Sequence, residues 1–553
     1  MFAVVALALL IAPLVASAPL FDPDEGLHAA IAQEMVQRGD YVTPTFRGEP
    51  FLDKPILFFW AEAASMRIVG HNEAAVRIPP LLFGLFGMLA VALLGRALLG
   101  ESAGLIAGIV YGTMLLPMGV SEVAVHDIGL VPFLCVAALC LTRVSSARDG
   151  SRSPVQNGVI AGIALGLSIL TKGLVGIVFT GIFAACLVAR RPASLLRVAI
   201  TLTIAVVVAG AVAAPWYIAM EHAHPGYLHY YFVERHLQGY LTATQRHGGR
   251  PFYYYLPIVV GGALPWTAYL IGAASRAVAS ARAARSALGA GALATVAHEN
   301  SMRAVLWGWF AIGLVFLSIG ESKLVTYALP LFPALALIIG EYFSDLQALR
   351  LQAEDRLLGL AYAAHVLTLA LLPALGLILI QWKFHAVHPY HWVPVAVFSL
   401  LTIDAGRRAA RSPSADALMA GIVRMTLYGV VGMMIVAPRA AAWMTSRDLA
   451  ASFNSTGTLP PRVSVVDERV GSLIFYLDPP LRADATPDRV NATSFPEAMM
   501  RVRHDPPDAV TVVRNSQVPR FNRLFPSPPA PDVRAGTFSV FRADTLRAAL
   551  GAR

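Results

Sequence analysis

Long apolar runs of the length that crosses a bilayer dominate the sequence. Hydrophobic residues make up 56% of the 553 residues and charged residues only 14%, whereas soluble domains carry roughly 25% charged residues. A spanning helix needs about 20 apolar residues. About thirteen runs approach that length: 2–20, 77–99, 102–120, 128–142, 157–171, 173–189, 195–217, 253–274, 304–320, 327–343, 356–382, 391–405 and 415–437. The sequence therefore predicts a polytopic α-helical membrane protein.

The first run and one short segment need separate treatment. Residues 2–20 lack the basic start of a signal peptide, so a retained first helix is expected, although cleavage at residues 16–18 is the alternative. Residues 56–69 are apolar but short, and they carry Glu62 and Arg67. This composition favours a helix that lies on the membrane surface.

Basic residues set the predicted orientation. A net charge of +9 could indicate nucleic-acid binding, but the arginines fall in short loops between apolar runs. With the N-terminus inside, every inside loop is basic, as the positive-inside rule requires. We therefore expect membrane lipids as neighbours and no nucleic-acid partner. Residues 1–437 form the predicted transmembrane domain, with outer loops at 21–76, 121–127, 218–252 and 321–326.

The composition changes after residue 437. Segments such as 510–514 and 538–542 are rich in β-branched and aromatic residues, and proline-rich connections separate them. We expect residues 438–553 to form a small soluble α/β domain on the outer face. This region contains no recognisable catalytic motif.

Lysines are rare and fall on one side of the predicted membrane. Only four of the 43 basic residues are lysines: Lys54, Lys172, Lys323 and Lys383. All four lie at outer ends of apolar runs. A lysine ammonium is a compact charge suited to phosphate. Snorkelling at a helix end is the alternative explanation, and we favour it for Lys383.

Acidic and aromatic residues share the outer side with these lysines. The first outer loop carries Asp22, Asp24, Glu25 and Asp53, the second carries Glu122, His126 and Asp127, the fourth is rich in His, Arg and Tyr, and the fifth carries Glu321 and Tyr327. Charged residues at a membrane are functional candidates when they face a shared cavity. We predict such a cavity, with cations for a phosphate and aromatic rings for a sugar. Unrelated interfacial residues are the competing interpretation.

Several motifs resemble one enzyme family. They are Asp24-Glu25, Glu34-Met35, Gly39-Asp40, Lys54-Pro55, Phe59-Trp60 and Arg77-Ile78-Pro79, followed by HYYFVERHLQGY and ESKLVTYALPLFPALAL. This ordered set resembles the lipid A aminoarabinose transferases, which are GT-C glycosyltransferases of the protein mannosyltransferase-like group. Two departures are GLHAA after Asp24-Glu25, where relatives carry an Arg-Tyr-Ala type sequence, and Asp53, where Glu is common.

The resemblance implies transfer of 4-amino-4-deoxy-L-arabinose from undecaprenyl phosphate to lipid A phosphate, a lipopolysaccharide modification that gives polymyxin resistance. It also implies a multi-pass protein of the bacterial inner membrane with its active site facing the periplasm. Asp24, Glu25 and Asp127 are the catalytic candidates. The substrate-binding candidates are Asp53, Lys54, Lys172, Arg235, Arg246, Lys323 and Tyr327. A hydroxyl acceptor would require Asp24 as a general base, whereas a phosphate acceptor needs little deprotonation.

The sequence predicts no required cofactor. Asp53, Glu234, His236 and His247 are residue types that zinc accepts, but their spacing follows no zinc motif. The three cysteines lie inside apolar runs and form no thiol metal motif. No glycine-rich nucleotide loop is present, which agrees with a lipid-linked sugar donor.

Two other functions fit parts of this pattern. A related glycosyltransferase could use the same lipid carrier with a protein or another cell-envelope acceptor. A transporter or flippase belongs to a different class, and such proteins often carry broken helices and polar sites at the membrane midplane. In this sequence the charges lie at the ends of the apolar runs, which argues against transport.

Overall fold

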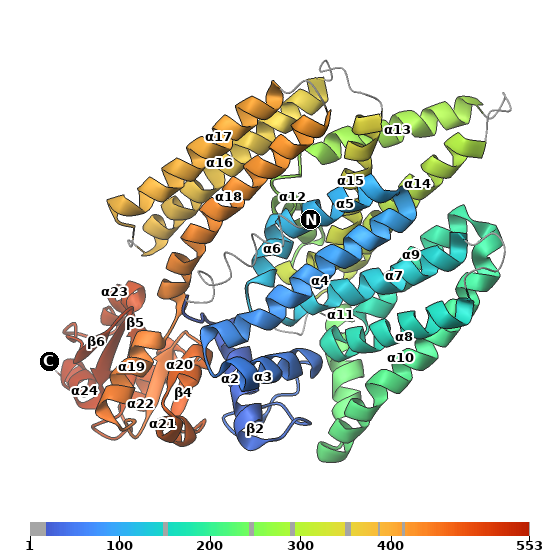
Figure 1. The fold of residues 1–553 in the computed structure, drawn as a ribbon. Coiled ribbons are helices and arrows are strands. Elements are labelled where there is room, and N and C mark those ends of the chain that lie inside the picture. Colours follow the sequence, from blue (N-terminus) through green and yellow to red (C-terminus); the bar gives the residue numbers. More distant parts are fainter. Residues whose placement is uncertain are drawn as a thin grey trace.

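The computed structural model is a long helical assembly with a small α/β unit at one end (Figure 1). It describes residues 18–146, 153–242, 248–287, 294–348, 356–384, 387–411 and 415–551. Most of the predicted first span, 2–20, lies outside these residues. Extensive helix contacts join Pro154–Lys172 (α8) to Leu195–Ala223 (α10), Glu101–Thr113 (α5) to Glu73–Leu99 (α4) and to Phe332–Ala348 (α15), and Val175–Arg190 (α9) to Ala294–Ile319 (α14).

Seven helices in the described part of the chain are long and apolar enough to cross a membrane, or eight if one bent pair counts as a span. The seven are Glu73–Leu99 (α4), His126–Ser146 (η1 and α7), Pro154–Lys172 (α8), Pro192–Ala223 (η2 and α10), Met302–Ile319 (in α14), Val325–Leu346 (η5 and most of α15) and Leu357–Trp382 (in α16). Val175–Arg190 (α9), Phe252–Gly262 (η4 and α12) and Ala420–Gly432 (in α18) are shorter apolar helices. A multi-helix membrane fold is thus present, and the number of thirteen spans stays a prediction.

Two of the predicted spans are interrupted. Glu101–Thr113 (α5) and Leu115–Ser121 (α6) meet at an angle of 64°. The predicted run 253–274 is also not one helix, because Tyr255–Gly262 (α12) and Tyr269–Ala287 (α13) are separate. Two glycines, at 261 and 262, and Pro265 lie at this break. Proline has no backbone N–H, and glycine is costly inside a helix, so the chain turns here.

The first outer loop is mostly ordered structure. Asp24–Arg38 (α2) leads into a short hairpin, Thr45–Phe46 (β1) and Glu49–Pro50 (β2), and then into Leu57–Val69 (α3). The Glu34 carboxylate accepts hydrogen bonds from the Arg47 and Gly48 amides, 2.7 and 2.8 Å, and so fixes the hairpin turn. Helix α3 occurs where a surface helix was predicted, with Glu62 on its buried side.

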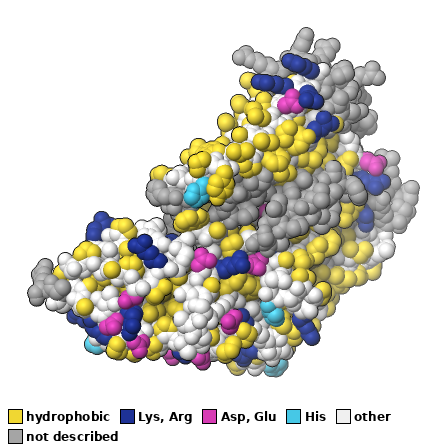
Figure 2. All heavy atoms as spheres, turned by 60° about the vertical axis from the view of Figure 1, so that its left-hand side comes forward, with side chains coloured by type: hydrophobic (Ala, Val, Ile, Leu, Met, Phe, Trp, Pro, Cys, Tyr) yellow, Lys and Arg dark blue, Asp and Glu magenta, His cyan; other side chains and the backbone are white. Residues whose placement is uncertain are grey.

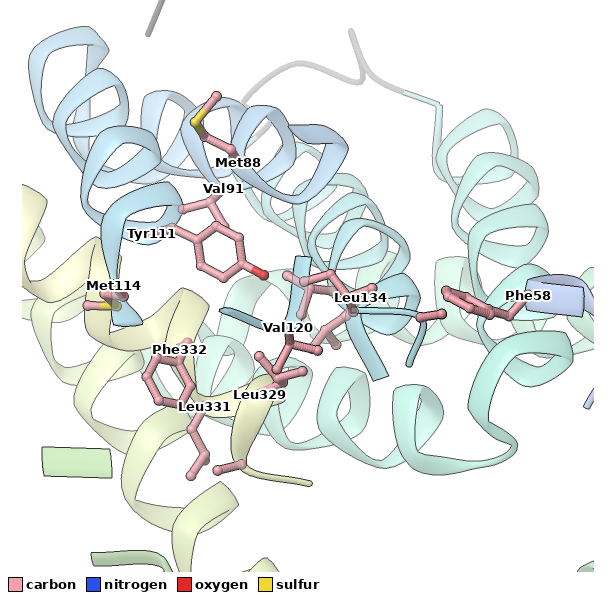
Figure 3. Close-up of a cluster of buried hydrophobic side chains, with 14 of the residues drawn as sticks. Phe58, Met88, Val91, Tyr111, Met114, Val120, Leu134, Leu329, Leu331 and Phe332 are labelled. Carbon is pink, nitrogen blue, oxygen red and sulfur yellow. The ribbon is translucent and has the colours of Figure 1, made fainter. Parts of the chain in front are cut away.

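A hydrophobic core lies directly behind this loop. Figure 3 shows Phe58 of α3 on one side and Leu329, Leu331 and Phe332 on the other, with Leu134 of α7 and Val120 of α6 between them. Phe58 is four residues after Lys54, and Leu329 is two residues after Tyr327. Close packing holds such side chains in single conformations. The core therefore fixes the backbone next to several predicted site residues.

Three later helices form a layer of their own. These are Arg356–Phe384 (α16), Trp392–Ala410 (α17) and Ala415–Met444 (α18), and they pack against one another. Figure 2 shows hydrophobic side chains across this helical part, between charged side chains at its far end and on the α/β unit. Leu367, Leu371 and Leu375 of α16 are exposed. This distribution is the one expected for a bilayer-embedded layer.

Residues 447–551 form the α/β unit, and their sheet has the order β4-β3-β5-β7-β6. Its strands are Val463–Val466 (β3), Val490–Thr493 (β4), Val510–Arg514 (β5), Val533–Ala535 (β6) and Phe538–Arg542 (β7). The helices around the sheet are Arg447–Thr456 (α19), Gly471–Tyr476 (α20), Pro479–Asp484 (α21), Phe495–Val502 (α22), Val518–Asn522 (α23) and Ala543–Gly551 (α24).

Strands β4, β3 and β5 are parallel to one another, whereas β7 is antiparallel to both of its neighbours, β5 and β6. The predicted boundary at 438 falls inside α18, which continues to Met444. We therefore place the start of this C-terminal unit at α19.

Glycines allow α8 and Leu195–Ala223 (α10) to pack closely, and this contact can be tested. A Cβ on Gly162 of α8 would lie 2.5 Å from the Val208 Cβ of α10, whereas a Cβ on Gly210 of α10 would meet nothing within 4 Å. We expect Gly162→Ala to destabilise the protein by about 1–3 kcal/mol, the usual cost of overpacking. Thermal unfolding in detergent measures this change. Gly210→Ala is the matched control, and equal unfolding temperatures for the two variants would contradict the packing.

Candidate active site

A cavity of about 1460 Å³ lies between the first outer loop, the ends of several membrane helices and the C-terminal unit. It is lined by eight of the predicted site residues: Asp24, Asp53, Lys54, Asp127, Lys172, Arg235, His236 and Tyr327. Residues separated by about 300 positions in the chain thus share one cavity. Its walls combine carboxylates, cations and aromatic rings, as a site for a sugar phosphate requires.

The central interaction is an ion pair between two helix ends. Lys172, the last residue of α8, donates a hydrogen bond of 2.7 Å from Nζ to Oδ2 of Asp127, which lies in the turn His126–Gly129 (η1) before α7. The Lys172 ammonium also lies 4.8 Å from the ring centroid of Tyr327, at the start of Val325–Leu331 (η5). Three separate elements are therefore joined at this point.

Lys54 supplies a positive charge that this ion pair does not neutralise. Within the described residues, no carboxylate lies within 4.0 Å of its ammonium, and Lys172 is a neighbouring cation. Burial, together with the charge of Lys172, lowers the pKa of Lys54 to about 7. Such a lysine is ready to gain an anionic partner. Lys54 and Lys172 together make this part of the cavity a phosphate-binding candidate.

Asp24 supplies a free carboxylate. It is the first residue of α2 and is exposed to the cavity. No hydrogen bond or ion pair involves its side chain among the residues that the structure describes. Asp24 is therefore available for contact with a substrate, whereas Asp127 is already bonded to Lys172.

The fourth outer loop covers one side of the cavity as a π-helix, His229–Gln238 (η3). Tyr230 donates a hydrogen bond of 2.7 Å to Oδ1 of Asp53, and the Arg235 guanidinium lies 3.4 Å from Oδ2 of the same carboxylate. π-Helical turns are rare and are often found at functional sites. These contacts tie the fourth loop to the residue next to Lys54.

The cavity does not include every predicted residue. The Glu25 carboxylate is fully buried and forms a two-point ion pair with Arg77 at 2.8 and 2.7 Å, so it does not line the cavity. Its position supports a structural role and not the predicted catalytic one. Lys323 is also buried outside the lining, and its ammonium donates to the Arg250 carbonyl at 3.2 Å. Arg246 lies outside the described residues.

The zinc prediction has no test in this part of the chain. His247 lies outside the described residues, and among those described no three His, Cys, Asp or Glu side chains are grouped closely enough to hold a metal. The Asp53 carboxylate accepts a hydrogen bond from the Tyr230 hydroxyl, and Oε1 of Glu234 lies 3.3 Å from Nδ1 of His229. The Nδ1 atom of His236 is 2.7 Å from the Tyr231 carbonyl oxygen. Zinc therefore stays a prediction.

Some cavity residues were not among the predicted site residues. His28 and His126 both line the cavity, with ring centroids 4.5 Å apart, and burial lowers the pKa of His28 to about 4, so its imidazole is neutral. His28 is four residues after Asp24 on α2, a helical spacing that could have identified it. Asp467 and Arg469 of the C-terminal unit also line the cavity, and no local sequence signal indicates this.

The fold and motifs match known proteins. Residues 53–218 match the family described as dolichyl-phosphate-mannose-protein mannosyltransferase. They contain Lys54, Asp127 and Lys172, so the matched region carries the central part of the site.

Individual relatives are more specific. The chain is 31% identical over 366 residues to the undecaprenyl phosphate-α-4-amino-4-deoxy-L-arabinose arabinosyl transferase of Aeromonas salmonicida, covering 64% of this chain and 63% of that protein. The protein of the same name from Enterobacter sp. is 29% identical over 332 residues, covering 60% and 56%. These matches thus span less than two thirds of the relatives' length. The match to the mannosyltransferase family over residues 53–218 and these likenesses confirm the predicted resemblance.

Solved structures show the fold. The crystal structure of ArnT from Cupriavidus metallidurans bound to undecaprenyl phosphate superposes with a TM-score of 0.73 and 22% identity, covering 98% of this chain and 97% of that one. Its apo state gives a TM-score of 0.72. The chain therefore shares the fold of ArnT over nearly its whole length.

The different positions of two adjacent acids generate a stability test. Removing one partner of a buried ion pair costs about 3–5 kcal/mol, whereas a change at an exposed, unpaired side chain costs about 0.5 kcal/mol or less. We expect Glu25→Gln to lower the unfolding temperature by several degrees and Asp24→Asn to leave it nearly unchanged. Thermal unfolding of both variants in detergent measures this. An unaffected Glu25→Gln protein would contradict the structural role of Glu25.

Proposed function

We propose that this chain transfers 4-amino-4-deoxy-L-arabinose from undecaprenyl phosphate to a phosphate of lipid A. One observation carries the proposal: a single cavity brings the free carboxylate of Asp24 together with the ammonium of Lys54, which has no carboxylate within 4.0 Å among the described residues. The names of the arabinosyl transferase relatives suggest which sugar and which lipid carrier the reaction uses. The match to the mannosyltransferase family supports glycosyl transfer as the class of reaction.

The proposed step needs one bond made and one bond broken. An oxygen of the acceptor phosphate attacks the anomeric carbon of the sugar, and the bond from that carbon to the undecaprenyl phosphate oxygen breaks. The bonding electrons go to the leaving phosphate, which becomes a monoester. Lys54, with Lys172 beside it, stabilises the negative charge that develops there. An ionised acceptor phosphate needs no proton transfer, so the charges balance.

Asp24 has a positioning or basic role that depends on the acceptor. With a phosphate acceptor, its carboxylate holds the ammonium or the hydroxyl groups of the aminosugar. With a hydroxyl acceptor on a protein or another envelope polymer, it would remove the hydroxyl proton as a general base. An unpaired Asp24 carboxylate could serve either a phosphate or a hydroxyl acceptor, so the assay must include both kinds of acceptor.

The proposal includes the location of the site. We place the cavity at the periplasmic face of the bacterial inner membrane, with about thirteen helices spanning it and the C-terminal unit on the periplasmic side. The basic loops between apolar runs support this orientation. We propose that no cofactor takes part, and treatment with a chelator before the assay tests the zinc alternative.

Turnover by the purified protein tests the proposed reaction. With undecaprenyl-phosphate aminoarabinose and lipid A in detergent, we expect free undecaprenyl phosphate and lipid A carrying one added aminosugar, detected by mass spectrometry. Asp24→Asn should lower the rate by about 100-fold or more, the usual size of a lost acid, base or positioning group. Asp404→Asn, an exposed acid on α17 outside the cavity, is the matched control.

Two results would contradict this reaction. Transfer to a peptide or polysaccharide but not to lipid A would favour the alternative acceptor. Movement of the intact lipid-linked sugar across a vesicle membrane, without cleavage of its anomeric bond, would favour a flippase.

Lys54 gives the phosphate site a pH dependence. Because its pKa is about 7 in the free protein, the neutral side chain must take up a proton to pair with an anion above that pH. Affinity for undecaprenyl phosphate should therefore weaken by up to about tenfold per pH unit above neutrality. In Lys54→Arg the cation stays protonated, so the pH dependence should become flat. Isothermal titration over a pH series measures this, and an equally steep pH dependence in Lys54→Arg would contradict the assignment.

A further inference from the structure

The C-terminal unit touches the start of α2 through a buried contact that joins residues 450 positions apart. The backbone amide of Ser472 donates to Oδ1 of Asp22 at 3.0 Å, and its hydroxyl donates to Oδ2 at 2.5 Å. The Asp22 amide donates in turn to the Met444 carbonyl at 3.0 Å. Asp22 is 4% exposed and Ser472 is fully buried. We call this set of hydrogen bonds the Asp22–Ser472 contact.

The backbones meet closely beside this contact. A Cβ on Gly26 of α2 would lie 2.4 Å from the Ser472 amide nitrogen, and a Cβ on Gly471 would lie 2.3 Å from the Leu27 amide nitrogen. Real Cβ atoms do not approach other atoms so closely, so both positions require glycine. Helices α2 and α20 therefore cross with their main chains in direct contact.

These contacts hold the chain on both sides of Asp24. Asp22 is bonded two residues before it, Gly26 is packed two residues after it, and Glu25 is paired with Arg77. Asp24 itself has no hydrogen bond or ion pair among the described residues. Its place in the cavity thus depends on its neighbours, while its carboxylate stays free for a substrate.

We propose that Asp22 and Ser472 are positioning residues for Asp24, and that the C-terminal unit completes the active site by fixing the start of α2. The proposal rests on the transfer reaction proposed above. It gives the C-terminal unit a role in the chemistry, although this unit contains no catalytic motif. The same unit lines the cavity with Asp467 and Arg469, a few residues before Ser472.

The geometry separates this role from two others. Asp22 lines the cavity, but both of its carboxylate oxygens accept hydrogen bonds from Ser472, so it is not a free catalytic acid. Simple attachment of the C-terminal unit is the other possibility. Tyr476 of α20 contributes to attachment without touching the α2 start: its hydroxyl accepts from the Leu20 amide at 2.7 Å and donates to Glu73 at 3.0 Å.

Steady-state kinetics of Ser472→Ala, Asp22→Asn and the double variant test the proposal. Misplacing a reacting group by about 1 Å can cost about 100-fold in rate, so we expect each single variant to lose about tenfold to 100-fold in kcat. The KM for the lipid-linked donor should change by less than about threefold, because the Lys54 region is untouched. The double variant should be no slower than the slower single variant, since both act on the same hydrogen bond between the Ser472 hydroxyl and the Asp22 carboxylate.

Tyr476→Phe is the matched control for attachment. It removes two hydrogen bonds of the same interface, so its unfolding temperature should fall about as far as that of Ser472→Ala. Its kcat should stay within about threefold of wild type, because Asp24 keeps its position.

The outcomes distinguish this proposal from the function on which it rests. Wild-type turnover, with Ser472→Ala and Asp22→Asn slowed in kcat well below Tyr476→Phe, supports the positioning role. Wild-type turnover with equal kcat in all three variants overturns it and leaves the transferase function in place. Additive losses in the double variant also overturn it, because independent effects cannot come from one contact. Absence of wild-type turnover overturns the proposed reaction, and the positioning role with it.

Discussion

The ion pair between Lys172 and Asp127 organises the site. It joins the end of α8 to the start of α7, and Tyr327 adds the start of η5 through its ring. A charged side chain near hydrocarbon is costly unless it has a partner or faces water. The Lys172 and Asp127 side chains thus neutralise each other. Among the described residues, Lys54 has no carboxylate within 4.0 Å and Asp24 has no hydrogen bond or ion pair. The proposed sugar-phosphate site rests on these two free groups of opposite charge in one cavity.

Two groups of structural elements hold the cavity residues in place. On one side, membrane helices and the core around Leu134 and Leu329 hold the segments that carry Asp127, Lys172 and Tyr327. On another side, the hydrogen bonds of Asp22 to Ser472 and the close crossing of α2 and α20 at two glycines fix the start of α2, which carries Asp24. Catalysis by positioning needs such support, since small displacements of a reacting group are costly.

Much of this arrangement was predictable from the sequence, because apolar side chains are placed in the membrane and charged side chains need water or a partner. Apolar runs predict membrane helices, and rare lysines at their outer ends predict a polar cavity. Asp24, Lys54, Asp127 and Lys172 could therefore be predicted as residues that line it. Glu25 could not be separated from Asp24, because one residue along a helix turns the side chain to another face, and only Arg77 reveals which face is buried. Only the structure shows that the Lys323 ammonium donates to the Arg250 carbonyl and lies outside the cavity lining. The walls formed by Asp467 and Arg469 depend on a contact across most of the chain, which no local pattern encodes.

The central claim is that one cavity holds the lipid-linked phosphate beside Lys54 while Asp24 faces the sugar. An electron cryomicroscopy structure of the protein in a nanodisc with undecaprenyl phosphate tests it directly. The account predicts density for the phosphate within hydrogen-bond distance of the Lys54 ammonium and in the same cavity as Asp24. Phosphate density at Lys323, or anywhere outside the cavity lined by Lys54 and Lys172, would contradict it.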